Sequence, residues 1–213
     1  MAASSGSPRA TLVLGHGAGG GIQAADLVAL AESLPGRGID VVRVEQPWRV
    51  AGRRVAAPPP TLDRAWTAVL TQLDVRGALV VGGRSAGARV ACRTAAQVGA
   101  VGCLALAFPL RPPGRPDRSR LAELAATGVP TLVVQGERDA FGAPAEFPTD
   151  PEGYAVHGVA GADHSFRVRA PASRSAVLTE VTAVVGDWVD ALAGGRPRPA
   201  ARARRESRSQ RDG

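Results

Sequence analysis

Apolar runs alternate along the chain with segments that have a helical pattern of apolar and polar positions. The runs predict strands near residues 11–14, 41–45, 78–82, 103–107, 131–135 and 154–159. The helical segments lie near residues 21–34, 61–74, 86–97, 119–127 and 172–192. Alternating strands and helices are typical of a mostly parallel sheet with helices on both faces. The pattern therefore predicts an α/β fold with a sheet of about six strands.

The composition fits one domain with a sizeable core. Of the 213 residues, 45% are hydrophobic and only 4% are aromatic, so the core must be built from Ala, Val and Leu. We expect a folded domain over residues 10–193, preceded by a flexible N-terminus over residues 1–9. Residues 194–213 are rich in Arg, Pro and Ala, and we expect them to form a disordered tail.

This tail also holds most of the charge. Seven arginines against Glu206 and Asp212 contribute +5 of the formal net charge of +7, which leaves the domain nearly neutral. A charge confined to a solvated tail argues against nucleic acid as a partner, although weak binding of the tail to anionic surfaces stays open. The oligomeric state also stays open.

The cysteines and the N-terminus bear on the cellular setting. Cys92 and Cys103 lie in apolar surroundings, so we expect buried free thiols. The first residues lack a basic stretch followed by an apolar core, and the longest apolar stretch, residues 98–110, is too short to span a bilayer. The sequence therefore predicts a soluble, cytoplasmic protein with no membrane partner.

The segment Gly83-Arg84-Ser85-Ala86-Gly87 follows the third predicted strand and precedes a predicted helix. A serine on a sharp turn between strand and helix needs small neighbours two positions away on either side, because the backbone packs closely there. Glycine at positions 83 and 87 meets this need. The motif predicts a nucleophile elbow with Ser85 as the nucleophile.

A serine hydroxyl is a poor nucleophile unless a histidine takes its proton and an acid orients that histidine. Asp139 follows the fifth predicted strand and His164 follows the sixth, with Glu137 and Asp163 as further acids nearby. Loops beyond the carboxyl ends of parallel strands converge on one edge of the sheet, so the three side chains can meet in one cleft. The order Ser, Asp, His is that of the α/β-hydrolases.

The glycine-rich turn at residues 15–20 follows the first predicted strand. Acyl transfer needs N–H donors aimed at the developing oxyanion. The turn offers the N–H of Ala18, and Ala86, which follows the nucleophile, offers a second. We therefore predict an oxyanion hole formed by Ala18 and Ala86.

These segments resemble a known family. The chain is similar to the small, capless α/β-hydrolases related to dienelactone hydrolases, and most closely to the branch that includes the hydrolase-like domain of a eukaryotic chromatin-complex subunit. The motifs that carry this resemblance are residues 15–20, 46–54, 82–89, 136–142 and 161–166, and it spans roughly residues 10–193. Ala86 stands where this branch commonly has a bulkier residue, often methionine.

The resemblance implies a serine hydrolase that cleaves an ester, thioester or similar acyl bond with Ser85, His164 and Asp139, without a cofactor. The crossover between the fourth and fifth predicted strands is too short for the helical cap that hydrolases with lids usually carry there. We therefore expect an open site and a small-molecule acyl substrate. Some members of the branch serve as interaction domains, so a non-catalytic interaction module is the alternative.

Candidate substrate contacts are His16, Gly17, Arg84 and Arg53. A planar guanidinium can hold a carboxylate or phosphate of a substrate. Arg89, one turn into its helix, is expected to form a surface ion pair instead. The three histidines are scattered and lack a short ligand spacing, so no metal site is predicted.

The same glycine turn also fits the dinucleotide fingerprint G-x-G-x-x-G, with Glu45 at the end of the next strand as the acid for a ribose hydroxyl. This interpretation, a Rossmann protein, leaves Ser85, Asp139 and His164 after three strands in the required order as a coincidence. The hydrolase interpretation is therefore preferred.

Overall fold

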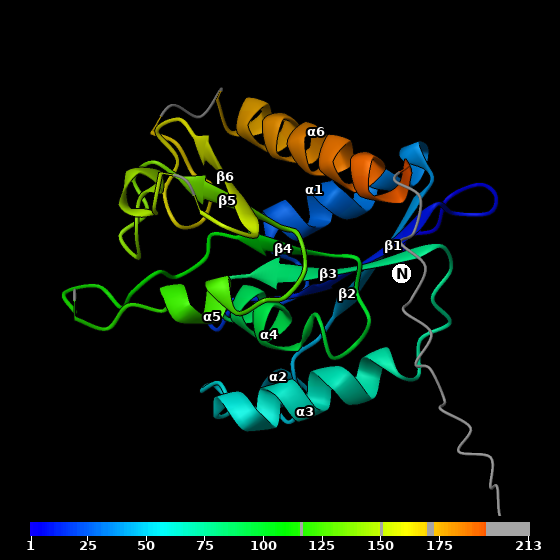
Figure 1. Ribbon diagram of the computed structural model, residues 1–213, viewed down its shortest axis with the longest axis horizontal. Coiled ribbons are helices and arrows are strands. Elements are labelled where there is room, and N and C mark those ends of the chain that lie inside the picture. Colours follow the sequence, from blue (N-terminus) through cyan, green and yellow to red (C-terminus); the bar gives the residue numbers. More distant parts are fainter. Residues whose placement is uncertain (116, 150, 170–172, 195–213) are drawn as a thin grey trace, which may run out of the picture.

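A single parallel sheet forms the centre of the computed structural model, which describes residues 1–115, 117–149, 151–169 and 173–194 (Figure 1). Its strands are β1 (Ala10–Gly15), β2 (Ile39–Val44), β3 (Ala78–Arg84), β4 (Gly102–Leu106), β5 (Thr131–Gly136) and β6 (Tyr154–Val159). They are ordered β2-β1-β3-β4-β5-β6, and every neighbouring pair is parallel. All six strands lie within two residues of their predicted bounds, so the predicted α/β sheet is confirmed.

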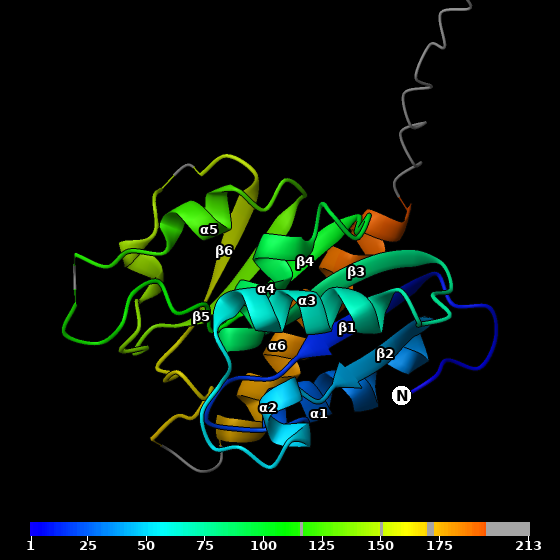
Figure 2. The same ribbon diagram turned by 90° about the horizontal axis from the view of Figure 1, so that it is seen from below.

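Helices cover both faces of this sheet. They are α1 (Ala25–Ser33), α2 (Pro47–Val50), α3 (Pro59–Leu70), α4 (Ala86–Thr94), α5 (Leu121–Ala125) and α6 (Ser173–Gly194), with short 3₁₀ turns η1 (Leu34–Arg37) and η2 (Pro144–Glu146). Helices α1 and α6 pack together on one face, while α4 covers the other (Figure 1). Figure 2 shows α3 beside α4 on that second face.

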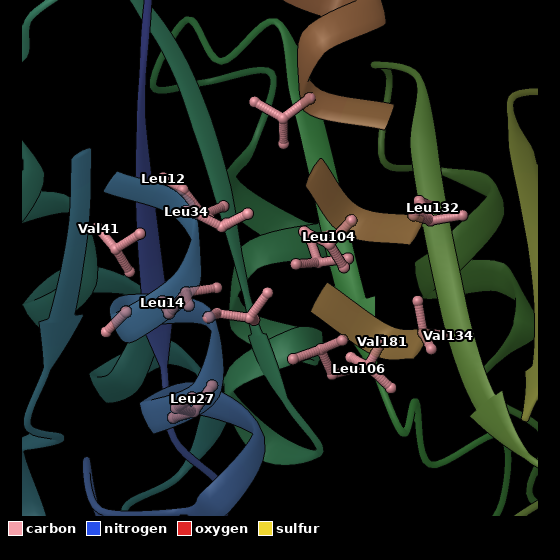
Figure 3. Close-up of a cluster of buried hydrophobic side chains, with 14 of the residues drawn as sticks. Leu12, Leu14, Leu27, Leu34, Val41, Leu104, Leu106, Leu132, Val134 and Val181 are labelled. Carbon is pink, nitrogen blue, oxygen red and sulfur yellow. The ribbon is translucent and has the colours of Figure 1, made fainter. Parts of the chain in front are cut away.

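Alternation along the strands builds a core on each face. Leu12 and Leu14 of β1 point towards α1 and α6, whereas Val13 between them points towards α3 and α4. Strands β3, β4 and β5 alternate in the same way. Figure 3 shows the first core, where strand leucines meet Leu27 of α1 and Val181 of α6. Burial on both faces explains why the strands read as continuous apolar runs.

The helices differ from their predicted bounds mainly at the ends. The helix predicted over residues 21–34 begins only at Ala25, because the glycine-rich turn occupies the residues before it, and it continues as the 3₁₀ turn η1. Helix α3 begins at Pro59, where the fixed φ of proline suits the first helical position, and it ends at Leu70 rather than at residue 74. The short helix α2 was not predicted, although Pro47 at its start is a signal of the same kind.

The crossover from β4 to β5 leaves the carboxyl edge of the sheet open. In the described part of this crossover, residues 107–115 and 117–130, the only helix is the five-residue α5. The prediction of a fold without a cap domain is confirmed. Loops therefore border this edge of the sheet.

The sequence predicts a flexible N-terminus over residues 1–9. Residues of this segment instead make specific contacts with β2. Ala2 forms an antiparallel bridge with Val41 of β2. The backbone N–H and the hydroxyl of Ser4 both donate to Oδ1 of Asp40, at 2.7 and 2.9 Å. Of the predicted tail, residues 195–213 lie outside the described residues.

The buried thiols predicted for Cys92 and Cys103 are confirmed, since both are free and nearly inaccessible to solvent. Within the described ranges, no helix combines the length and apolar character needed to cross a membrane.

Candidate active site

Ser85 lies on a tight turn between β3 and α4. Its backbone has φ +52° and ψ −110°, a conformation that residues with a side chain rarely adopt. The turn packs against β1, because a Cβ added at Gly83 or Gly87 would lie 2.4 or 2.2 Å from the carbonyl oxygen of Gly15. Only glycine fits at both positions, so the elbow geometry follows from the sequence motif.

A chain of hydrogen bonds joins the three residues predicted to act together. The hydroxyl of Ser85 lies 3.0 Å from Nε2 of His164. On the other side of the ring, Nδ1 of His164 lies 2.7 Å from Oδ2 of Asp139. In the tautomer that satisfies both contacts, Nδ1–H donates to the carboxylate, and Nε2 is free to accept the hydroxyl proton.

Asp139 is fixed by donors other than His164. The amide Nε2 of Gln135, the penultimate residue of β5, donates to Oδ2 of Asp139 at 2.9 Å. The backbone N–H of Phe141 donates to Oδ1 at 2.8 Å. The carboxylate side chain is completely buried, and a buried charge is tolerated only when it is hydrogen-bonded in this way.

The loop that carries His164 is anchored to the core. Phe166, at φ +51°, is completely buried in the core shared with α6. Asp163 accepts the backbone N–H groups of Ser165 and Arg167, which closes the loop on itself. Thus Asp163 stabilises the loop, whereas Asp139 is the acid that contacts the imidazole. The other nearby acid, Glu137, accepts the N–H of Gly161.

The glycine turn after β1 lies against the nucleophile. A Cβ added at Gly17 would lie 3.3 Å from the Cβ of Ser85 and 3.9 Å from its Oγ. The next residue, Ala18, is exposed. Ala86 is the first residue of α4, where backbone N–H groups have no partner within the helix. Both predicted oxyanion donors therefore sit on segments that border Ser85.

His16 is turned away from the cleft. Its side chain is completely buried, and Nδ1 lies 2.8 Å from the carbonyl oxygen of Gly17. Its Nε2 accepts the N–H of Gln46 at 2.9 Å and lies 2.8 Å from Oε1 of Glu45. The substrate contact predicted for His16 has no accessible surface to support it. Instead the ring ties the glycine turn to the end of β2.

Arg84, which precedes the nucleophile, contacts the protein itself. Its Nη2 donates to the carbonyl oxygen of His164 at 2.5 Å and to the hydroxyl of Ser165 at 3.0 Å. Its Nε lies 3.2 Å from Oδ2 of Asp26, and only 12% of the Arg84 side chain is exposed. The predicted substrate contact would have to displace these partners.

The side chains of Arg53 and Arg89 lie against other parts of the protein. Arg53 lines a hollow of about 740 Å³ beside α2, and the residues around it do not include Ser85, Asp139 or His164. Arg89 pairs with Glu123 of α5 at 2.5 Å, as expected for an ion pair on the helix surface.

Three residues of this region escape prediction from the sequence: Asp26, Gln135 and Phe141. The ring of Phe141 packs against that of His164, with the centroids 4.3 Å apart. Gln135 and Phe141 lie close in sequence to Asp139, the candidate acid. This closeness is the only indication in the sequence that they belong to the site. Asp26 gives none, because it lies in the first turn of a helix that carries no motif and is distant in sequence from Ser85, Asp139 and His164. No group of three or more His, Cys, Asp or Glu side chains that could hold a metal occurs within the described ranges.

The strand order separates this fold from the Rossmann alternative. Dinucleotide-binding sheets are ordered 3-2-1-4-5-6, whereas here β1 lies between β2 and β3. Glu45, the candidate for a ribose contact, lies instead against His16.

Comparison with known proteins agrees with this fold. Among solved structures, Est1E from Butyrivibrio proteoclasticus with bound ferulic acid has a TM-score of 0.65 at 15% identity, covering 87% of this chain and 91% of that chain. The esterase domain of a Rhodothermus marinus protein has a TM-score of 0.64 at 14% identity, and the match covers 88% of this chain and 89% of that chain. XC6422 from Xanthomonas campestris is described as a serine hydrolase without a lid. It has a TM-score of 0.56 at 20% identity, and the match covers 83% of this chain and 82% of that chain.

At these identities the likeness shows a common fold. A search of curated proteins finds no match. The family model described as "Alpha/beta hydrolase domain" matches residues 8–190, which is most of the chain. The chain therefore belongs to the alpha/beta hydrolase family.

Proposed function

We propose that the protein is a serine hydrolase that cleaves an ester, thioester or similar acyl bond. The observation that carries this proposal is the unbroken chain of hydrogen bonds from Ser85 through His164 to Asp139, at 3.0 and 2.7 Å. A serine, a histidine and a buried carboxylate in this arrangement are the parts that nucleophilic acyl transfer needs.

The reaction would run in two halves. Oγ of Ser85 attacks the carbonyl carbon while its proton passes to Nε2 of His164. The bond to the leaving group then breaks, and the same proton passes to the departing oxygen or sulfur. A water molecule, deprotonated by His164, then attacks the acyl carbon, the bond to Oγ of Ser85 breaks, and His164 returns the proton to Oγ. Asp139 stays ionised throughout, holds the Nδ1–H tautomer and stabilises the imidazolium.

The oxyanion of the tetrahedral intermediate would be held by two backbone N–H groups. Ala86 supplies one from the first turn of α4, where the helix dipole also favours negative charge. Ala18 supplies the other from the exposed glycine turn. Donors that are fixed before the reaction cost no reorganisation when the charge develops, which is why they contribute strongly.

The relatives support this class of reaction. Est1E is described with ferulic acid bound, and the Xanthomonas campestris protein is described as a serine hydrolase without a lid. We further place the chain in the branch related to dienelactone hydrolases, on the motifs around Ser85, Asp139 and His164. An open cleft with no cap favours small acyl groups or acyl groups at the end of a larger molecule.

Intact mass after exposure to a fluorophosphonate tests the proposal. Activated Ser85 would form a P–O bond and expel fluoride, so one adduct is expected on the wild-type protein and none on Ser85→Ala. Ser119→Ala is a matched control, because that serine is exposed and its hydroxyl accepts only a backbone N–H, from Leu121. This variant should react like the wild type.

The absence of an adduct on protein with a cooperative thermal transition would contradict the proposal. It would favour the alternative of a non-catalytic interaction module. A positive result leads to a panel of esters and thioesters with acyl chains of increasing length, which would define the acyl group.

A further inference from the structure

Arg84 links three parts of the molecule: β3, α1 and the loop after β6. It ends β3, directly before Ser85, and its side chain extends towards Asp26 in the first turn of α1. Its Nη2 also reaches the loop after β6, where it donates to the carbonyl oxygen of His164 and to the hydroxyl of Ser165. The same guanidinium therefore contacts the backbone of the residue that the mechanism uses as its base.

The Arg84–Asp26 pair lies almost entirely inside the protein. The Asp26 side chain is 3% exposed and that of Arg84 is 12% exposed. Burial raises the pKa of Asp26, and the nearby positive charge of Arg84 opposes this rise. A pair of this kind is expensive to bury and contributes little net stability against an apolar pair of the same size. The position of the pair indicates a role in placing neighbouring groups rather than in stabilising the fold.

We infer that Arg84 is a positioning residue: held from behind by Asp26, its guanidinium fixes the loop so that the imidazole of His164 meets the hydroxyl of Ser85. This inference rests on the proposed function. It also replaces the sequence-based hypothesis that Arg84 binds an anionic group of the substrate, since Nη2 and Nε of the guanidinium are already directed at the protein.

Two features make this contact effective. The nucleophile and the base come from strands that are not neighbours, β3 and β6, so their distance depends on how the β6 loop is held over the sheet. Phe166 anchors this loop from the core side, and Arg84 anchors it from the side of the nucleophile. A shift of about 1 Å in a reacting group can cost roughly a hundredfold in rate.

The test compares Arg84→Gln and Arg84→Lys with wild type by the rate of phosphonylation of Ser85. Arg84→Gln should lose about a hundredfold in rate. Arg84→Lys keeps a positive charge, but its single ammonium cannot reach both Asp26 and the loop as Nε and Nη2 of Arg84 do, so its rate should be intermediate. Arg93→Gln is the matched control, because the Arg93 side chain is also mostly buried, at 20% exposed, and pairs with Asp63 and Glu123 away from the loop. It should lower the melting temperature without changing the rate.

A second readout does not depend on reactivity. The proton that His164 Nδ1 donates to Asp139 should give a downfield NMR signal in the wild type, and this signal should weaken or vanish in Arg84→Gln but persist in Arg93→Gln. If Arg84→Gln fails to fold, Arg84→Lys and Ser165→Ala carry the same comparison with smaller expected losses.

The outcomes separate the two proposals. An unreactive wild type would overturn the proposed function, and the NMR signal would then decide the positioning role by itself. A reactive wild type matched by Arg84→Gln, with the signal intact, would overturn the positioning role. A loss confined to KM for negatively charged esters would also overturn it, because neutral and anionic substrates should lose rate equally.

Discussion

Gly87 packs against Gly15 so closely that a Cβ at position 87 would lie 2.2 Å from the carbonyl oxygen of Gly15. Helix α4 thus begins in direct contact with β1, and Ser85 is held on the turn between β3 and α4. The backbone at the elbow cannot relax away from the sheet without moving the helix.

The substitution Gly87→Ala should therefore destabilise the protein. Forcing a methyl group into a packed backbone contact typically costs 1–3 kcal/mol, roughly, and occasionally more. Thermal unfolding measures the loss, and Gly19→Ala is the control because a Cβ there meets no atom within 4 Å. Equal melting temperatures for the two variants would contradict the close contact at the elbow.

Gly17→Ala should act on reactivity more than on stability. The added Cβ would lie 3.3 Å from the Cβ of Ser85, a contact that small shifts of the turn can relieve. Such shifts would misplace the neighbouring N–H of Ala18. The rate of phosphonylation should fall, by less than the roughly 10²- to 10³-fold lost when a whole oxyanion donor is removed. An unchanged rate would argue that the turn lies outside the reacting centre.

The sequence predicted the sheet well because buried parallel strands leave a strong signal. The run at residues 103–107, for example, is apolar throughout, and its short length between turn signals favours a buried strand. The elbow was predictable for the same reason, since the glycines around Ser85 meet a steric need within five residues. These features depend on short segments alone.

Contacts between distant segments were not predictable. Asp26 lies in a helix with no motif, and its meeting with Arg84 depends on how α1 packs on the sheet. His16 carries a motif but is buried, because the glycine turn folds back over β2. The N-terminal contact between Ser4 and Asp40 likewise arises only when β2 is in place at the edge of the sheet.

Asp139→Asn should abolish most activity while leaving the fold intact. Loss of the carboxylate removes the preference for the Nδ1–H tautomer of His164, and in serine hydrolases such a change lowers kcat by about 10⁴-fold. Ester hydrolysis with thermal unfolding alongside measures both effects. Glu137→Gln is the control, since Glu137 is exposed and contacts Gly161 rather than His164. If Glu137→Gln lost as much activity, Asp139 would not be the orienting acid.

The two cysteines should be unreactive in the folded protein. Their sulfur atoms lie 3.8 Å apart, and both side chains are almost inaccessible. The contact with Cys92 and burial raise the pKa of the Cys103 thiol, so the reactive thiolate is disfavoured. Titration with a chromogenic disulfide reagent at pH 8 should find no thiol in the native state and two in denaturant. Rapid reaction of either thiol before unfolding would contradict this burial.

The contacts between Asp40 and the N-terminal segment should make the stability of the protein depend on pH. Burial alone would raise the pKa of Asp40, but the N–H and hydroxyl of Ser4 and the guanidinium of Arg76 lower it. A carboxyl whose pKa is lower in the folded state stabilises the protein above its unfolded value, about 3.9, and this contribution is lost as pH falls through the folded value. Asp40→Asn should therefore cost roughly 1–3 kcal/mol in the free energy of unfolding at pH 7, because the donors of Ser4 and Arg76 lose a charged acceptor. Denaturant unfolding of Asp40→Asn and wild type at several pH values should show this difference shrinking below pH 4. The exposed Glu32→Gln serves as control, and a difference from wild type that is independent of pH would show that Asp40 stabilises the fold by packing alone.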